Sequence, residues 1–204
     1  MKVCKNTAIA RLGLFVLLTA LLGGSGFAQG DGQDPEQPGA STVRVFTGGS
    51  HFFKVVLTED TVVNLDPGPI VGFSEYANLP GASGVAVIAG QGTLVNVRFN
   101  AESQCSGGGT DAGWCGLQIL VDGVEAQPAP ADYAFDSTNN GAEGTASWQG
   151  HAMERHLCIR NPGGAVRTVP VQVQWRVFNN SGAQPIFRLD DWSLAIESAI
   201  ATCQ

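Results

Sequence analysis

Two stretches near the C-terminus decide the fold that this sequence predicts: Val166-Arg-Thr-Val-Pro-Val-Gln-Val-Gln-Trp-Arg-Val-Phe178 and Phe187-Arg-Leu-Asp-Asp-Trp-Ser-Leu-Ala-Ile196. In the first, apolar side chains recur at every second position from Val169 to Val177. A period of two held this long is typical of a β-strand with one buried face. A polar turn at residues 179–182 separates the stretches, which predicts two strands that face each other.

The second stretch changes phase at Asp190 and Asp191. The apolar positions up to Leu189 share one parity, whereas those from Trp192 onward share the other. A straight strand would expose one of the two sets to water. An extra residue restores the phase, so we predict a β-bulge at the two aspartates.

Working outward, the rest of the chain carries the same signals. Residues 93–101 and 151–159 alternate as half-buried strands, whereas residues 70–83 read as irregular. The sequence indicates about nine short strands separated by frequent Gly and Pro turns. No amphipathic helical pattern occurs after residue 28. We predict an all-β fold, an antiparallel, jelly-roll-like β-sandwich.

The N-terminus carries an export signal. Lys2, Lys5 and Arg11 form a positive region, an apolar run follows at residues 12–22, and small residues precede a cleavage site after Ala28. The apolar run is too short to cross a bilayer. We predict a signal peptide at 1–28, a disordered leader at 29–41 and a single domain at 42–203. The product is then secreted, extracellular or periplasmic, without membrane insertion after cleavage.

Charge narrows the choice of partners. Without residues 1–28 the chain keeps 8 Lys and Arg against 18 Asp and Glu, a net charge of −10, and Lys54 is its one lysine. An acidic surface without a basic stripe repels phosphate backbones. Nucleic acid and anionic membranes are therefore poor partners.

Four cysteines remain after the signal peptide: Cys105, Cys115, Cys158 and Cys203. An even count in an exported chain indicates two disulfides, for which three pairings exist. Cys105 and Cys115 flank a glycine-rich segment and would close a hairpin-like loop. Cys203 would then join the tail to Cys158. Neither pair has the C-x₂-C spacing of a zinc site.

Three residues are candidates for binding. Trp148 is the one tryptophan in a loop-like context, where an exposed ring can stack on a sugar or anchor a protein interface. Asp190 and Asp191 are the other two, and they are also weak candidate ligands for Ca²⁺, with Asp122 or Asp136 assisting. No other cofactor is expected.

The segment His151-Ala-Met-Glu-Arg-His156 raises two further questions. Its histidines are five residues apart and point to opposite faces of a straight strand, so they cannot share a metal ion there. Arg155 lies on the core parity and would need a carboxylate partner. We expect an ion pair between Arg155 and Asp190 or Asp191.

Signals for catalysis are weak. The chain has no G-x-S-x-G nucleophile motif in a strand-to-helix setting. A glycosidase needs two carboxylates across a cleft, and 18 acidic residues allow any pair to be chosen. We therefore assign no catalytic residues.

Residues 171–177 and 187–197 resemble strands of uncharacterised exported proteins of bacteria and, more loosely, of jelly-roll modules of the C1q/TNF-like or carbohydrate-binding kind. The resemblance covers about residues 93–197 and rests on strand patterning. It implies a sandwich of ten or so strands with a binding role, and it carries over no functional residues. C1q-like modules are usually trimers, but this chain has no collagen-like or heptad stalk.

These observations predict a secreted, non-catalytic binding module for a glycan or a protein at the cell envelope or outside the cell. A structural protein that forms a homo-oligomer is the alternative, and a small secreted hydrolase is the third reading.

Overall fold

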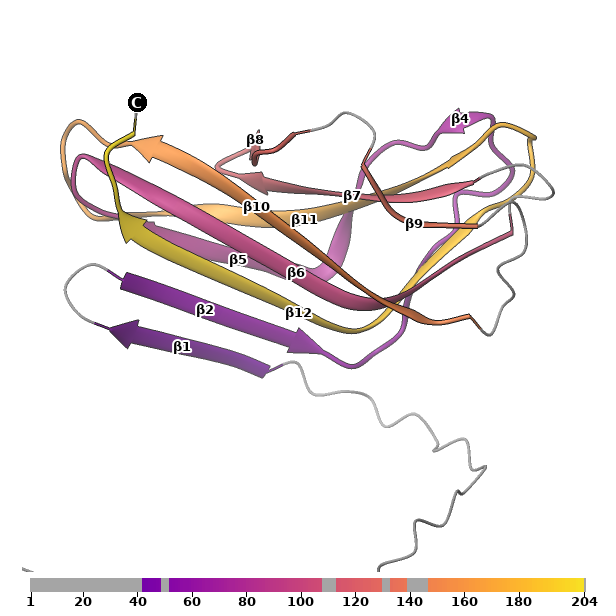
Figure 1. The fold of residues 1–204 in the computed structure, drawn as a ribbon, viewed down its shortest axis with the longest axis horizontal. Helices are drawn as coiled ribbons and strands as arrows, with labels where there is room; N and C mark the ends of the chain where they lie inside the picture. The colour runs from indigo at the N-terminus through magenta and orange to yellow at the C-terminus, as the bar shows by residue number, and fades with distance from the viewer. Residues whose placement is uncertain (1–41, 49–51, 108–112, 130–132, 139–146, 204) are drawn as a thin grey trace, which may run out of the picture. The chain divides into compact units, whose positions relative to one another are not determined.

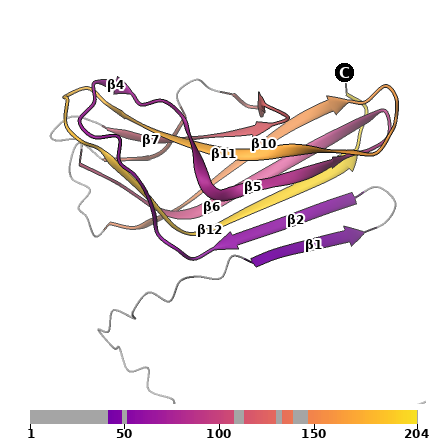
Figure 2. The same ribbon diagram turned by 180° about the vertical axis from the view of Figure 1, so that it is seen from behind.

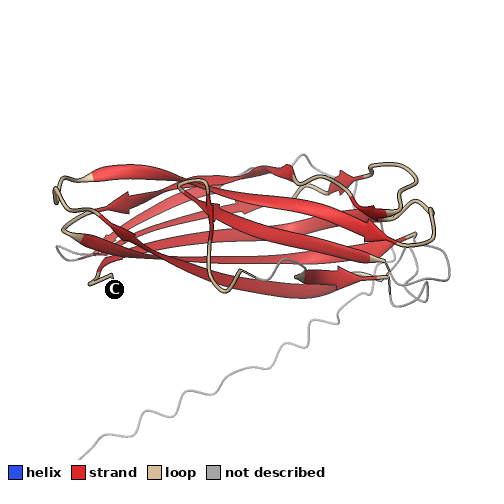
Figure 3. Cartoon of the chain, turned by 90° about the horizontal axis from the view of Figure 1, so that it is seen from above, coloured by secondary structure: helices blue, strands red, loops and turns tan. Residues whose placement is uncertain are grey.

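A computed structural model describes residues 42–48, 52–107, 113–129, 133–138 and 147–203. The predicted signal peptide and leader lie outside the described residues. Within them the chain forms strands and loops and contains no helix, as Figure 3 shows. Accordingly, the described residues include no helix long and apolar enough to cross a membrane.

The described residues form twelve strands in two sheets, and every pairing between these strands is antiparallel (Figures 1 and 2). The predicted all-β antiparallel class is therefore confirmed. The first sheet, here called sheet A, has the order β1-β2-β12-β6-β10, with β3 also paired to β12. Its strands are β1 (Thr42–Gly48), β2 (Phe52–Glu59), β3 (Val63–Leu65), β6 (Gly92–Ser106), β10 (Gln149–Arg160) and β12 (Ile186–Ile200).

Sheet B has the order β4-β11-β7-β8, with β5 also paired to β11 and β9 to β7. Its strands are β4 (Gly72–Phe73), β5 (Ala77–Ile88), β7 (Trp114–Val121), β8 (Val124–Glu125), β9 (Ala134–Ser137) and β11 (Arg167–Asn179). Neighbours in each sheet are mostly distant in sequence, so the chain crosses repeatedly from one sheet to the other. The jelly-roll connectivity stays a prediction.

The core lies between the sheets and is built from alternate residues. On β11 the inward side chains from Val169 to Val177 are at most 3% exposed, including Trp175. On β12 the inward residues include Leu194 and Ile196, both fully buried. The two strands that the sequence predicted to face each other therefore belong to different sheets and meet across the core.

The predicted β-bulge is present. The register of β12 on β6 shifts between Asp190 and Ser193, and Asp191 has a positive φ of 44°. Leu189 and Trp192 are both buried, at 0% and 1% exposed. The inserted residue thus moves the second half of the strand by one position, which keeps both apolar sets in the core.

Both predicted disulfides are formed, Cys105–Cys115 and Cys158–Cys203. The first does not close a hairpin, however. Cys105 lies on β6 of sheet A and Cys115 on β7 of sheet B. The bond therefore joins the two sheets across the core.

The expectation that residues 70–83 are irregular is wrong in part, because β5 begins at Ala77. Its register on β11 jumps between Ser83 and Asn78, opposite Gln172 and Gln174. Four residues there face a single residue of β11, and Gly81 takes a φ of 73°. The Pro and Gly signals mark this large bulge, and the strand continues through it.

Candidate functional site

Arg155 does not form the expected ion pair. It lies opposite Val97 on β6, whereas Asp190 lies opposite Glu102, five residues further along the same strand. That is about 17 Å of strand, beyond the reach of the two side chains. Arg155 is 8% exposed, donates to the Glu154 carbonyl oxygen at 2.9 Å and lies over the Tyr133 ring at 4.5 Å. A ring face and a backbone carbonyl thus contact the guanidinium of this buried side chain, in place of the expected carboxylate.

Trp148 and Asp190 are brought to the same end of sheet A. Gly150 and Asp190 both lie opposite Glu102, on its two sides, and Trp148 comes two residues before Gly150. Trp148 is 36% exposed, and Asp191 is exposed at the bulge. One strand separates the tryptophan from the aspartates, and neither of the two cavities described below includes any of the three.

The structure does not assemble the calcium site. Among the described residues, no group of three or more His, Cys, Asp or Glu side chains is close enough to hold a metal ion. The two assisting acids have other partners. Asp122 pairs with Arg167 at 3.5 Å, and Asp136 accepts a hydrogen bond from Ser103 at 2.7 Å.

Glu154 belongs to the outer surface of sheet A. It accepts a hydrogen bond from Asn96 at 2.7 Å and pairs with Arg98 at 3.6 Å. The Asn96 hydrogen bond, with a smaller contribution from the Arg98 charge, lowers the pKa of the Glu154 carboxyl. Glu154 is therefore a solvated surface acid.

Sequence reasoning missed a partly buried polar cluster of Ser103, Asp136 and His151. The Ser103 hydroxyl lies 2.7 Å from Asp136 Oδ2 and 2.8 Å from His151 Nδ1. The three residues come from β6, β9 and β10. No local motif joins them, since they are 33 and 48 residues apart.

The cluster contains the residue types of a hydrolase triad, but the hydrogen bonds connect the three side chains in a different order. In a triad the histidine lies between the serine and the acid and takes the serine proton. Here Ser103 lies in the middle, and its single proton is donated to Asp136. Ser103 is also fully buried, so a substrate cannot reach its oxygen. The geometry suits a structural link between the sheets.

The outer surface of sheet B presents a different arrangement, which begins with an aromatic row. Phe178 of β11 lies between Trp114 of β7 and Phe73 of β4. Its ring stacks on Trp114 at 4.8 Å and 29°, and its centroid is 4.5 Å from that of Phe73. Phe73 is 41% exposed. Three rings from three strands thus form one partly exposed apolar surface.

Arg176 comes next along β11, two residues from Phe178 on the same side of the strand. Its guanidinium lies 3.9 Å from the Phe73 ring centre and 4.3 Å from that of Tyr76. Two ring faces hold the side chain in one orientation, which limits the rotamer freedom that an exposed arginine would otherwise have.

An amide row follows, two residues further along β11. Gln118 donates to the Gln174 Oε1 at 2.6 Å, and Gln174 donates to the Asn78 Oδ1 at 2.7 Å. The row crosses β7, β11 and β5. Each amide is oriented by its neighbour and retains further donor and acceptor capacity.

A small notch separates the two rows at Gly116. Its volume is about 10 Å³, and it is lined by Phe73, Trp114, Gly116, Tyr133, Arg176, Val177 and Phe178. A Cβ at Gly116 would come within 3.0 Å of the Tyr133 carbonyl oxygen. The notch is the size of one water, so a ligand here would lie on the surface. We call the aromatic row, Arg176, Tyr76 and the amide row together the sheet B face.

Parts of this face were visible in the sequence. Gln174, Arg176 and Phe178 occupy the outward parity of the stretch that predicted β11. An aromatic residue among polar ones on that parity is the sequence signal that indicates this face. The sequence pattern does not indicate Phe73 and Asn78, because both lie within residues 70–83, the segment predicted to be irregular.

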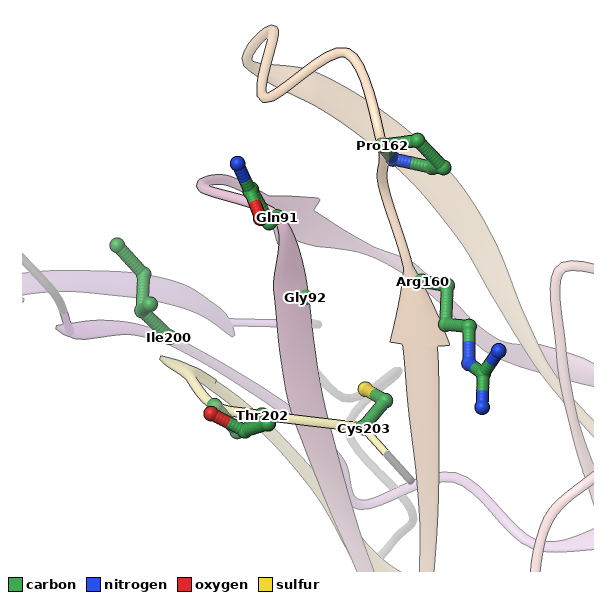
Figure 4. A pocket seen from close by; sticks show the side chains of 8 residues that line it. Gln91, Gly92, Arg160, Pro162, Ile200, Thr202 and Cys203 are labelled. Carbon is green, nitrogen blue, oxygen red and sulfur yellow. The ribbon is translucent and has the colours of Figure 1, made fainter.

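A larger hollow lies at the opposite end of sheet A from Trp148. Its volume is about 710 Å³, and it is lined by Gln91, Gly92, Arg160, Pro162, Ile200, Ala201, Thr202 and Cys203 (Figure 4). Its lining contains both apolar and polar residues, and Arg160 is the charged residue among them. The Cys158–Cys203 disulfide borders it through Cys203.

Comparison with known proteins adds no assignment: the chain matches no protein-family model and no curated protein. The candidate sites therefore rest on the geometry alone.

Proposed function

We propose that this protein is an exported, non-catalytic binding module and that the sheet B face binds a glycan. One observation carries the proposal: an exposed aromatic row and a pre-oriented amide row lie side by side on one sheet. Both rows are built on strands, so the contacting groups are held more rigidly than they would be on loops.

The aromatic row suits the apolar side of a ligand. The C–H face of a sugar ring is flat and apolar, and it can stack on an exposed aromatic ring. Phe73 offers such a ring: it is 41% exposed, Phe178 and Trp114 pack beside it, and Arg176 covers part of its face. Burying one ring face adds apolar contact with little loss of side-chain entropy, because the rings are already packed.

The amide row suits the polar side of the same ligand. Sugar hydroxyls donate and accept hydrogen bonds, and Gln174, Gln118 and Asn78 can do both. Arg176 adds donors between the rows. It is the one charged residue of the face as we define it, although the chain without its signal peptide has a net charge of −10. Neutral sugars and sugars with a carboxylate are both compatible with this charge.

Export and the finer fold are part of the proposal. The predicted signal peptide and two disulfides support an oxidising compartment, either extracellular or periplasmic. The placement of β12 between β2 and β6, and of β11 between β5 and β7, supports the jelly-roll connectivity.

Binding to a glycan array, followed by calorimetric titration of the best oligosaccharide, tests the function. Phe73→Ala should weaken binding about tenfold or more, which corresponds to about 1.4 kcal/mol. Trp148→Ala is the matched control, because it removes an exposed ring away from the sheet B face and should leave the affinity unchanged.

Two results would contradict the proposal. One is a loss of binding in Trp148→Ala but not in Phe73→Ala, which would return the site to the sequence-predicted tryptophan. The other is a molar mass by light scattering that falls when Phe73 is replaced, in a chain that binds no glycan. The face would then be an interface between copies of the chain.

A further inference from the structure

The two disulfides differ in how far solvent reaches them. Cys105 and Cys115 are 1% and 0% exposed. Cys158, in contrast, is exposed on the outer side of β10, and Cys203 is half-buried. Thiol–disulfide exchange requires a thiolate to reach one of the sulfur atoms. In the folded protein, therefore, the second disulfide is open to attack and the first is shielded.

The accessible disulfide fastens the end of the chain. Residues 201–203, here called the C-terminal strap, continue from β12 across the start of β6 toward β10 (Figure 4). A Cβ at Gly92 would lie 2.6 Å from the Ala201 carbonyl oxygen and 3.1 Å from Cys203 Sγ. The strap thus lies directly on Gly92, and the Ala201 N–H donates to the Gly92 carbonyl at 3.0 Å.

The hollow beside the strap borders the disulfide on its Cys203 side. It opens next to Cys203, and Arg160 contributes a positive charge to its lining. Arg160 also lies two residues from Cys158 on the exposed side of β10, so its charge favours the approach of an anionic thiolate to this end of the strand. The rest of the exported chain is strongly acidic, so this local charge lowers the repulsion that an anionic thiol would otherwise meet.

We propose that Cys158–Cys203 is a thiol–disulfide exchange site that accepts a dithiol reductant, and that its reduction releases the C-terminal strap while Cys105–Cys115 stays closed. The accessible and shielded positions of the two bonds carry this inference. It is independent of glycan binding, because the strap lies on sheet A and the proposed binding face belongs to sheet B.

The reaction runs in two displacements. A thiolate of the dithiol bonds to Sγ of Cys158, the more exposed of the two residues, and the S–S bond breaks with its electron pair going to Cys203 Sγ as thiolate. In the mixed disulfide, one sulfur belongs to the reductant and the other to Cys158. The second thiolate of the reductant then attacks the reductant's sulfur and releases the Cys158 thiolate. The protein gains two electrons from the dithiol and takes up, through the solvent, the two protons that the dithiol lost, while the dithiol becomes a cyclic disulfide.

Reduction should loosen only this end of sheet A. The core and the Cys105–Cys115 link are not touched, and the Ala201–Gly92 hydrogen bond remains as a weak attachment. Leu94 and Ile200 are already 37% and 43% exposed near the strap. Release of the strap would uncover more of the start of β6, including Gly92.

Native-state reduction tests the proposal directly. The folded chain with both disulfides is incubated with dithiothreitol, without denaturant, and free thiols are alkylated and located by peptide mass spectrometry. Label should appear on Cys158 and Cys203 at least about a hundredfold faster than on Cys105 and Cys115, because the latter need global unfolding. Equal rates for the two pairs, or no reduction of either, would overturn the proposal.

Two further measurements separate exchange from a purely structural bond. Glutathione with a rapid acid quench should trap an adduct on Cys158 with Cys203 free; an adduct on Cys203 instead would contradict the direction of attack. Hydrogen exchange at the Ala201 amide should accelerate about tenfold or more in C158S/C203S and in the reduced protein alike. Unchanged protection of that amide would mean that the disulfide does not fasten the strap.

Discussion

The outer surfaces of the two sheets are built from different residues, although their inner surfaces share one apolar core. On sheet A, charged and amide side chains pair across strands, as in Lys54–Glu197 at 2.7 Å and Asn100–Ser193 at 3.2 Å. On sheet B, rings from three strands pack on one another around Phe178. A solvated surface needs only polar residues, so the aromatic surface requires another explanation.

The comparison teaches where to look for function in a fold of this kind. Partly exposed rings on a sheet that also carries oriented amides match the composition of binding surfaces, whereas paired surface charges contribute little to stability or recognition. Three predictions, from the largest expected effect to the smallest, test whether the two surfaces differ in this way.

The aromatic row should contribute measurably to stability as well as to binding. Trp114→Ala removes a half-buried ring that stacks on Phe178, and we expect it to lower the free energy of unfolding by about 2 kcal/mol. Arg98→Ala on sheet A is the control, with an expected loss within about 0.5 kcal/mol. Urea unfolding of both variants measures the difference. Equal losses would remove the energetic distinction between the surfaces.

The ion pair between Lys54 and Glu197 should be worth little. Both side chains are more than a quarter exposed, at 29% and 27%, so solvent screens their attraction. A double-mutant cycle with Lys54→Ala and Glu197→Ala should give a coupling of about 0.5 kcal/mol that declines as salt is added. A coupling above about 2 kcal/mol that salt does not change would show that sheet A is organised by charge after all.

Glu154 should produce the smallest effect, visible as a dependence on pH. Its pKa is lower in the folded protein, chiefly because of the Asn96 hydrogen bond. The folded state is therefore favoured above the unfolded pKa, and this contribution is lost as the pH falls through the folded pKa. Glu154→Gln should flatten the acid limb of stability between about pH 3 and 6. Identical acid limbs would show that the Asn96 hydrogen bond is not formed in solution.

Much of the fold could be predicted because local pattern and global burial agree. Alternation identified β11 and β12, and the phase change at Asp190 and Asp191 located the bulge. The failures have physical causes too. β4 and β8 have two residues each, too few for alternation to appear. β5 was divided because Pro80 and Gly81 sit in a bulge inside a strand, where they imitate a loop.

The candidate site was less predictable. Trp148 was chosen because it is a tryptophan in a loop, yet the rings that gather on sheet B come from strands. Phe73, Trp114 and Phe178 are far apart in sequence, and only the pairing of β4, β11 and β7 places them together. The prediction of an Arg155 ion pair was wrong for the same reason. The parity of a residue along its strand indicates which face of the sheet it occupies, but it does not indicate which residue of the next strand lies beside it.

The sequence by itself determined the class: an all-β chain with an apolar layer of alternate residues and an even number of cysteines that indicates two disulfides. Tertiary structure alone decided which strands are neighbours, and so which outward side chains share a surface and which disulfide stays open to solvent. The physical reason is that alternation encodes burial, a property of each strand separately, whereas register and sheet order arise only when separate segments pack against one another.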